Sequence, residues 1–276
     1  MDRGSILIVG VGGIGCQWSG SAHDKCQQLA DLLMVDADES SFTSHHEAHC
    51  LHLDANGSAR GTAALPKLAA HRLNEGITNI SELLVKSELV VLLTALGGGT
   101  GSGATAEIAA KSRDSGSLVI SIVGIPFAEQ PLRCAIAEKA LPPIERNSDL
   151  CIRVSLERLA WQARHRDSDW KLGSEWIGEL IEGLVTTLAR VGKMNLDLMD
   201  LRTVVGRPGN ATLIVGNGTT DDPDGVVRMA RDSPLSEISV DGAKGCMIQV
   251  EGGPDMTLGH LNTCLLYTSP SPRDRG

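Results

Sequence analysis

Aromatic residues are scarce in this chain: its 276 residues include four Trp, two Phe and one Tyr, or 3% in all. We therefore expect a core built from Val, Ile, Leu and Ala. Long apolar runs are missing too, because no stretch approaches the roughly 20 residues that a membrane-spanning helix needs. No signal-peptide pattern precedes the first apolar segment. We expect a cytoplasmic protein with no direct membrane insertion.

An excess of basic residues is also lacking. Lys and Arg number 25 against 34 Asp and Glu, which gives a formal net charge of −9. A nucleic-acid-binding surface needs a basic footprint, so we expect no nucleic-acid partner. The composition favours protein partners, or a ligand that is held by backbone groups.

The seven cysteines contain no C-x-x-C pair. An odd number of scattered thiols argues against a disulfide framework and favours reduced cysteines. The stretch His45-His46-Glu47-Ala48-His49-Cys50 carries metal-ligand residue types, but neighbouring side chains do not all face one point. We expect a solvated polar segment there, and no metal site built from side chains.

Glycine, by contrast, is concentrated at one place. The stretch Gly97-Gly98-Gly99-Thr100-Gly101-Ser102-Gly103 follows the apolar run Leu89–Leu93 and precedes a helix-compatible segment, Thr105–Arg113. Glycines allow positive φ and a close approach to a ligand, and a helix N-terminus attracts anions. Thr100 and Ser102 add hydroxyl donors. We expect a phosphate cradle; the alternative is a flexible surface loop.

A Walker-type phosphate loop is excluded, because no Lys followed by Ser or Thr ends this stretch. Its residues instead resemble the signature of the tubulin and FtsZ superfamily of GTPases. The resemblance runs from about Ser5 to about Thr263. It implies bound GTP or GDP, and a Mg²⁺ ion held mainly by the phosphates.

A second glycine pattern stands near the start of the chain. The apolar segment Ser5–Val9 enters Gly10-Val11-Gly12-Gly13-Ile14-Gly15, and Asp36 and Asp38 follow the next strand. Alone, this pattern also fits a Rossmann-type oxidoreductase or an adenylating enzyme. The resemblance assigns a place beside the nucleotide and its magnesium to Asp38, for which a solvated acidic turn is the alternative. It assigns phosphate contacts to Gly10, Gly12, Gly13 and Gly15.

Contacts to the sugar and the base follow from the resemblance as well. Glu129 and Arg133 are implied to hold ribose and phosphate, although their spacing also fits a helical ion pair. Trp170 stands where the family has an aromatic residue that packs on the base. Ser174 stands where the family has an Asp that reads guanine, and Leu156 where it has an Asn. Since a hydroxyl accepts fewer N–H groups than a carboxylate, we expect weaker guanine selectivity than phosphate binding.

Apolar residues recur at helical spacing between Ile177 and Val191 and predict a long central helix. It leads to Asn195-Leu196-Asp197-Leu198-Met199-Asp200, which resembles the family's synergy loop. Because that loop enters the nucleotide pocket of the next subunit, Asn195, Asp197 and Asp200 are implied as catalytic residues. They would polarise the attacking water. The alternative is an ordinary acidic turn.

One segment departs from the family pattern. Residues 60–66 resemble the loop that closes over the γ-phosphate, but they are fewer and lack its interior glycines. Fewer backbone donors reach the terminal phosphate, so we expect slow hydrolysis.

Apolar strands that alternate with helical segments specify a parallel sheet covered by helices. We expect an α/β fold with a Rossmann-like GTPase domain over residues 1–176. A central helix and synergy loop over 177–200 and an incomplete mixed α+β domain over 201–263 would follow. Residues 264–276, rich in Ser, Pro and Arg, cannot form a core, and we interpret them as a non-native or disordered tail.

The resemblance implies a GTP-hydrolysing cytoskeletal protein that assembles head to tail into filaments for prokaryotic cell division. Other cell-division proteins would be its further partners. Two alternatives remain: a weakly hydrolysing nucleotide-binding scaffold of the same superfamily, and the oxidoreductase or adenylating enzyme. The oxidoreductase or adenylating enzyme explains neither the glycine stretch Gly97–Gly103 nor the synergy loop.

Overall fold

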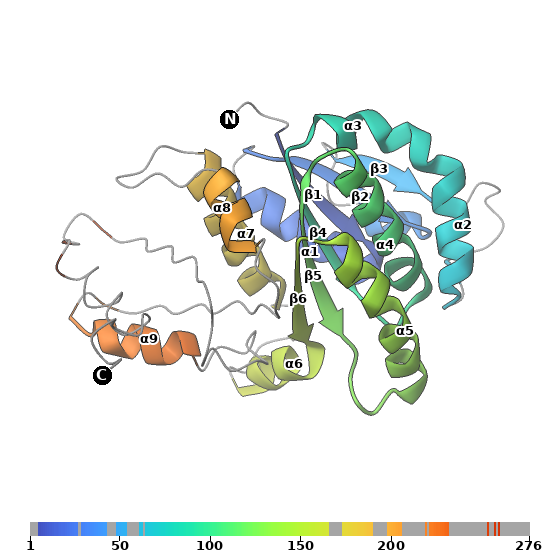
Figure 1. The fold of residues 1–276 in the computed structure, drawn as a ribbon. Coiled ribbons are helices and arrows are strands. Elements are labelled where there is room, and N and C mark those ends of the chain that lie inside the picture. The colour runs from blue at the N-terminus through green and yellow to red at the C-terminus, as the bar shows by residue number, and fades with distance from the viewer. Residues whose placement is uncertain are drawn as a thin grey trace, which may run out of the picture.

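The computed structural model describes residues 5–26, 29–42, 48–53, 61–62, 64–165, 173–189, 198–205, 219, 221–231, 253, 257 and 259. Within them lies one sheet of six strands in the order β3-β2-β1-β4-β5-β6, and all neighbouring strands are parallel (Figure 1). The strands are β1 (Ile6–Val11), β2 (Asp31–Asp36), β3 (His49–His52), β4 (Leu89–Ala95), β5 (Leu118–Ile125) and β6 (Leu150–Ser155).

The apolar runs form strands because both of their faces are covered. Every residue of β1 is buried, as are the first six of β4 and the first seven of β5. A parallel sheet buried on both faces calls for such continuous Val, Ile and Leu runs. The predicted α/β fold is confirmed, with strand ends that differ from the predicted ones by one or two residues.

Helices cover both faces of the sheet (Figure 1). On one face the core joins α1, α6, α7 and α8, and on the other it joins α2, α3, α4 and α5. The helices are α1 (Gly12–Lys25), α2 (Pro66–Gly76), α3 (Ser81–Lys86), α4 (Gly99–Asp114), α5 (Pro131–Asn147), α6 (Leu156–His165), α7 (Gly173–Ala189), α8 (Leu198–Val205) and α9 (Pro223–Arg231), with the short 3₁₀ helices η1 (Glu39–Phe42) and η2 (Ile77–Ile80).

The strand order reverses between β1 and β4, which lie side by side. From β1 the chain leaves through α1 on one face of the sheet, and from β4 it leaves through α4 on the other. At such a switch point the loops after the two strands part and leave a crevice at the carboxyl edge. Both glycine patterns of the sequence lie at this place.

The predicted central helix is α7, which begins at Gly173, four residues before the predicted start. Its buried residues Ile177, Ile181 and Val185 lie in the same core cluster as Trp18 of α1. A Cβ on Gly178 would lie 3.0 Å from Cδ of Lys25. This close approach of α7 to α1 holds the long helix against the sheet.

Residues 210–215 and 245–250, whose apolar side chains predict two further strands in the second domain, lie outside the described residues. The proposed domain boundaries and the tail over 264–276 therefore stay predictions. No helix among the described residues is long and apolar enough to cross a membrane.

Candidate nucleotide site

The two glycine-rich turns meet at the switch point. A Cβ on Gly12, whose φ is +76°, would lie 3.2 Å from the backbone nitrogen of Gly101. Beneath the turns, the hydroxyl of Thr94 donates a hydrogen bond of 3.0 Å to the carbonyl oxygen of Val11. The N-termini of α1 and α4 are thereby fixed side by side.

The glycine stretch Gly97–Gly103 is mostly helix, not loop. We predicted a helix from Thr105, but α4 begins at Gly99, so Thr100–Gly103 form its first turn. Within the stretch only Gly97 has a positive φ, of +93°. The prediction that the other glycines serve positive φ is wrong.

Those glycines are needed because neighbouring backbone leaves no room for a side chain. A Cβ on Gly101 would lie 2.5 Å from the carbonyl oxygen of Ala95, and one on Gly103 would lie 2.0 Å from that of Pro66. The alternative of a flexible surface loop is also wrong, since Gly99 and Gly101 are buried in the first turn of a helix.

The starts of α1 and α4 are suited to an anion. Neither N-cap residue, Val11 or Gly98, makes a side-chain capping bond, and neither first turn holds an acidic residue. A Cβ on Gly98 would have no atom within 4 Å, and the nearest atoms to one on Gly13 would lie at 3.8 Å. The residues present therefore fit a phosphate group, which free helix N–H groups and the helix dipoles bind.

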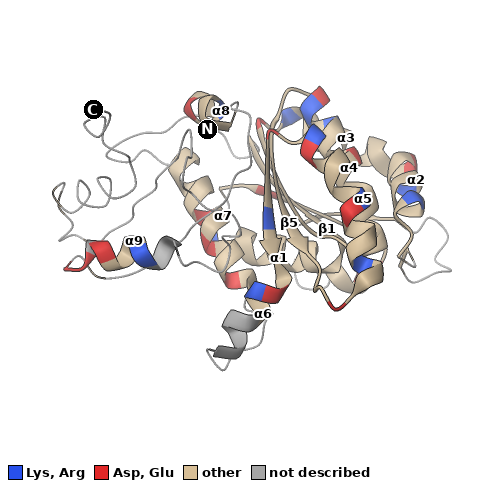
Figure 2. Cartoon of the chain, turned by 60° about the horizontal axis from the view of Figure 1, so that its bottom comes forward, with Lys and Arg blue, Asp and Glu red and all other residues tan. Residues whose placement is uncertain are grey.

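Charged side chains take little part in this arrangement. β1 and β5 carry no Lys, Arg, Asp or Glu and are drawn in tan in Figure 2. The first turns of α1 and α4 are likewise uncharged. A phosphate at this edge would be held by backbone groups and not by charged side chains, which is the kind of ligand site that we expected from the acidic composition.

The two predicted hydroxyl donors have different surroundings. Oγ of Ser102 accepts the N–H of Gly97 at 2.9 Å and so ties the turn to the helix. Oγ1 of Thr100 lies 3.3 Å from Oγ1 of Thr62, and both threonines are buried. Thr62 belongs to the segment 60–66 that the sequence indicated, but its contact with Thr100 was not predicted, because the two threonines are 38 residues apart.

Two aspartates follow β2, and their surroundings differ. Asp36 is buried and accepts hydrogen bonds from the backbone N–H of Ala37 at 2.7 Å and from Oγ of Ser41 at 2.6 Å. Its Oδ2 would lie 3.8 Å from a Cβ on Gly13. Asp38 is exposed and accepts the N–H of Ser40 at 3.0 Å. Asp36 therefore lies close to the start of α1.

Glu129 and Arg133 flank the start of α5. Glu129 stands before Pro131, the first helical residue, so the two do not form the helical i,i+4 pair that was the alternative. Both side chains are exposed. The backbone of Arg133 packs against Gly97, since a Cβ on Gly97 would lie 3.0 Å from the carbonyl oxygen of Arg133.

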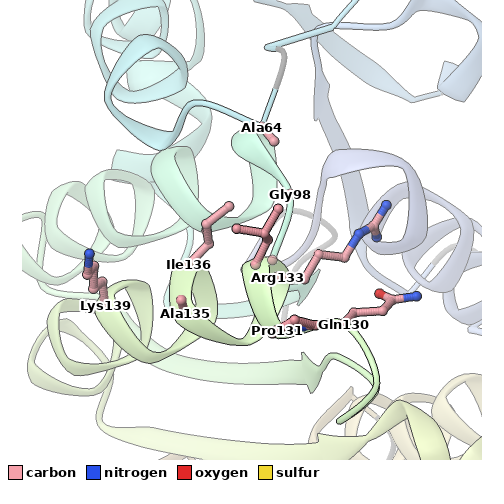
Figure 3. Close-up of a pocket in the computed structure, with 10 residues that line it drawn as sticks. Ala64, Gly98, Gln130, Pro131, Arg133, Ala135, Ile136 and Lys139 are labelled. Carbon is pink, nitrogen blue, oxygen red and sulfur yellow. The ribbon is translucent and has the colours of Figure 1, made fainter.

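A groove of about 770 Å³ opens beside these residues. In Figure 3 it lies between the turn at Ala64, the start of α4 at Gly98 and the first turns of α5. The side chains of Gln130 and Arg133 extend from the start of α5 to one side, and Lys139 lies at the other end. The lining residues are Ala64, Gly97, Gly98, Gln130, Pro131, Leu132, Arg133, Ala135, Ile136 and Lys139.

Some predicted site residues lie outside the described residues, and the structure does not test the roles of others. Trp170, Asn195 and Asp197 lie outside them. Ser174 is half-buried in the first turn of α7, and Leu156 is buried at the start of α6. The structure thus leaves the base contacts as predictions.

Asp200 lies at the opposite edge of the sheet. It stands in the first turn of α8, and two residues later Nη2 of Arg202 donates to the carbonyl oxygen of Gly116 at 2.8 Å. Gly116 belongs to the turn between the end of α4 and the start of β5. The structure therefore separates Asp200 from the phosphate-binding turns of its own chain.

Burial raises the pKa of several cysteine thiols among the described residues. Burial raises the pKa of Cys16, whose Sγ donates to the carbonyl oxygen of Gly10 at 3.6 Å. Burial also raises the pKa of Cys26 and of Cys151, each to about 12. The five cysteines of the described residues are free, in agreement with the prediction of reduced thiols.

Comparison with known proteins identifies the family. Residues 5–162 match the Tubulin/FtsZ family, GTPase domain, and residues 209–267 match the FtsZ family, C-terminal domain. The chain is 29% identical over 277 residues to Cell division protein FtsZ 1 of Archaeoglobus fulgidus, covering 98% of this chain and 75% of that one. It is 30% identical over 261 residues to Cell division protein FtsZ of Haloferax mediterranei, covering 92% and 69%.

The fold is similar to solved structures. An empty FtsZ dimer from M. jannaschii gives a TM-score of 0.83 at 24% identity, covering 95% of this chain and 78% of that one. A GDP-bound CetZ1 monomer from Haloferax volcanii gives 0.68 at 15% identity, covering 86% and 77%. Neither the oxidoreductase nor the adenylating enzyme is supported. The chain belongs to the tubulin/FtsZ family as an FtsZ-type protein, and its N-terminal half carries the GTPase domain of that family.

Proposed function

We propose that the chain binds GTP or GDP with its phosphates on the N-termini of α1 and α4, and hydrolyses GTP in head-to-tail assemblies that serve cell division. The relatives that it matches are named cell division proteins. The uncapped helix starts and the open space over Gly98 support phosphate binding at this edge. A Mg²⁺ ion would be held mainly by the phosphates and would neutralise part of their charge.

One observation supports the need for a second copy. The first turn of α4 lies at the phosphate edge, and the turn after its last residue accepts the hydrogen bond from Arg202 of α8. Because α4 has 16 residues, it spans about 24 Å at 1.5 Å per residue. The side chain of Asp200 therefore cannot reach a nucleotide bound to its own chain. A second copy stacked on the phosphate edge would place its own Asp200 beside that nucleotide.

The chemistry requires little of the protein beyond position and charge. Attack on the γ-phosphate needs a placed water molecule and an acceptor for its proton. Asp197 and Asp200 of the neighbouring copy would polarise this water, and Asn195 would help to hold it. The helix N–H groups at Gly98 and Gly99 would stabilise the charge on the phosphate oxygens.

A weakly hydrolysing scaffold is the second candidate, and two features favour it. Ala64 has a φ of +56° in the turn that faces the start of α4. An alanine has fewer accessible backbone conformations than a glycine, so it limits the shapes that this turn can take around a terminal phosphate. Leu156, which is buried and has no polar group, offers nothing to guanine at the start of α6.

The test measures GTP turnover per chain against protein concentration. We expect the rate per chain to rise with concentration, and Asp200→Ala to abolish that rise while leaving nucleotide binding intact. Glu107→Ala is the matched control, because Glu107 is an exposed carboxylate in the middle of α4.

A mixing experiment makes the test sharper. Gly98→Asp puts a carboxylate where the phosphate should bind, so this variant should be inactive. Mixed in equal amounts with Asp200→Ala, it should recover about a quarter of the wild-type rate, because one interface in four joins an intact site to an intact acid.

The remaining outcomes distinguish the candidates. A rate per chain that is independent of concentration would contradict shared sites. GTP binding without turnover at high concentration would favour the scaffold. NAD bound more tightly than GTP would refute both candidates.

A further inference from the structure

The imidazole ring of His52, the last residue of β3, makes three contacts with the segment that follows β2. Its Nε2 lies 3.1 Å from the carbonyl oxygen of Ala37, its Nδ1 lies 3.8 Å from Oε1 of Glu39, and its ring meets that of Phe42 edge to face, with 6.4 Å between the ring centres. Because a carbonyl oxygen only accepts hydrogen bonds, Nε2 carries a proton and donates it to Ala37. His52 thereby ties η1 to the edge strand of the sheet.

These contacts differ in strength. The side chain of Glu39 is 82% exposed, and an exposed ion pair adds little to stability. The carbonyl oxygen of Ala37 is the stronger partner, and it also accepts the N–H of Gly61 at 3.4 Å. At that length the bond from Gly61 is weak, so the proton on Nε2 of His52 is the main donor to this oxygen.

What η1 places beside the phosphate edge is the side chain of Ser41. A Cβ on Gly13 would lie 3.8 Å from Oγ of Ser41 and 3.8 Å from Oδ2 of Asp36. The hydroxyl of Ser41 donates to Oδ2 of Asp36 at 2.6 Å, while Oδ1 of Asp36 accepts the N–H of Ala37 at 2.7 Å. Both oxygens of this buried carboxylate are therefore hydrogen-bonded within the segment that follows β2.

The carboxylate of Asp36 lies close to the place where an anion should bind. The uncapped start of α1 attracts negative charge, whether that charge belongs to a phosphate or to a neighbouring carboxylate. A carboxylate released from Ser41 would be able to turn toward the N–H groups of α1. It would then compete with a phosphate for those groups, and its charge would repel the phosphate at short range.

We propose that His52 is a positioning residue of the nucleotide site, which holds η1 so that Ser41 keeps the carboxylate of Asp36 away from the start of α1. This inference rests on the proposed function. His52 acts through Ser41 and Asp36 and has no contact with the nucleotide itself. The phosphates then meet helix N–H groups that no carboxylate of the chain occupies.

The test measures the affinity for GDP at concentrations where the chain is monomeric. We expect His52→Ala to weaken GDP binding about two- to tenfold, which is the range for the loss of one net hydrogen bond. His52→Gln, whose amide can donate to the carbonyl oxygen of Ala37, should stay close to wild type. The matched control is His71→Ala, because Nδ1 of His71 also lies 3.8 Å from a glutamate oxygen, that of Glu75, but in α2.

A double variant distinguishes positioning from general support of the fold. Asp36→Asn removes the charge and keeps the shape, so it should restore GDP binding in the His52→Ala background. On its own, Asp36→Asn should change GDP binding less than about twofold. Ser41→Ala, which removes the bond to Oδ2 of Asp36, should weaken binding as His52→Ala does, and Asp36→Asn should restore it there too. If His52→Ala does not fold, His52→Asn takes its place, because the shorter amide does not reach Ala37.

Three results would overturn the inference. Unchanged GDP binding in His52→Ala would show that the ring does not act on the site. Weakened binding that Asp36→Asn fails to restore would mean that His52 only supports the fold. Weakened binding in Asp36→Asn alone would make Asp36 a ligand of the nucleotide or its metal ion. Each of these leaves the proposed function standing, whereas a wild type that binds no GDP refutes both.

Discussion

Replacement of Ala64 by glycine should stabilise the protein. Ala64 has a φ of +56°, and it is the one non-glycine residue with a positive φ among those described. The left-handed region costs an L-residue about 1–2 kcal/mol, because its Cβ approaches the following carbonyl oxygen. Glycine at this position would release that strain.

The net gain is smaller than the strain. Glycine also adds conformational freedom to the unfolded chain, which offsets about 0.4–1 kcal/mol. We therefore expect Ala64→Gly to raise the free energy of unfolding by about 0.5–1 kcal/mol. The matched control is Ala135→Gly, an exposed position inside α5, where glycine should lower stability by about 1 kcal/mol.

Urea unfolding followed by circular dichroism measures both variants against wild type. The two substitutions are chemically identical, so their opposite signs would come only from the backbone conformation. Equal destabilisation by both would refute the assignment of strain to Ala64. It would also remove the argument that this turn resists rearrangement.

Two further predictions concern the glycines and the thiols. Gly98→Ala should fold with nearly wild-type stability, because the added Cβ meets no protein atom within 4 Å. It should bind GTP more weakly, because that Cβ stands where the phosphate should lie. Gly103→Ala should lower the free energy of unfolding by about 1–3 kcal/mol, because its Cβ would lie 2.0 Å from the carbonyl oxygen of Pro66. Cys26 and Cys151 have pKa values raised by burial from 9.0 to about 12, so between these values the unfolded chain releases protons that the folded chain retains. The free energy of unfolding should then fall as the pH rises above about 9, and Cys26→Ala should reduce that slope in urea titrations at several pH values.

The strands could be predicted because their signal is local. Runs such as Leu89–Leu93 and Leu118–Val123 are apolar throughout, and only a sheet covered on both faces buries every one of their side chains. The start of α4 could not be predicted in the same way. Glycine lowers helix propensity, which favours a loop over Gly99–Gly103, but here tight packing against Ala95 and Pro66 decides the conformation.

The same distinction holds for the site. The phosphate turns could be found because glycine is the residue that such turns require at short spacing. The contact between Thr62 and Thr100 could not be predicted, since the two residues come from different strand–helix units and only the folded sheet brings them together. A local signal did exist for Glu129: Pro131 favours the first position of a helix, which puts Glu129 outside α5 and argues against a helical ion pair.

The hydrogen bond from Arg202 to Gly116 bears on how assembly would control turnover. It joins α8 to the turn that follows α4, while the first turn of α4 forms part of the phosphate edge. Asp200 and the phosphate turns are therefore fixed to one another through a single helix. A second copy stacked on the phosphate edge would bring its own Asp200 to the nucleotide. The rate of GTP hydrolysis per chain should then depend on the fraction of nucleotide sites that have a second copy stacked on them. At the end of the assembly where the nucleotide site is uncovered, the bound GTP should stay unhydrolysed.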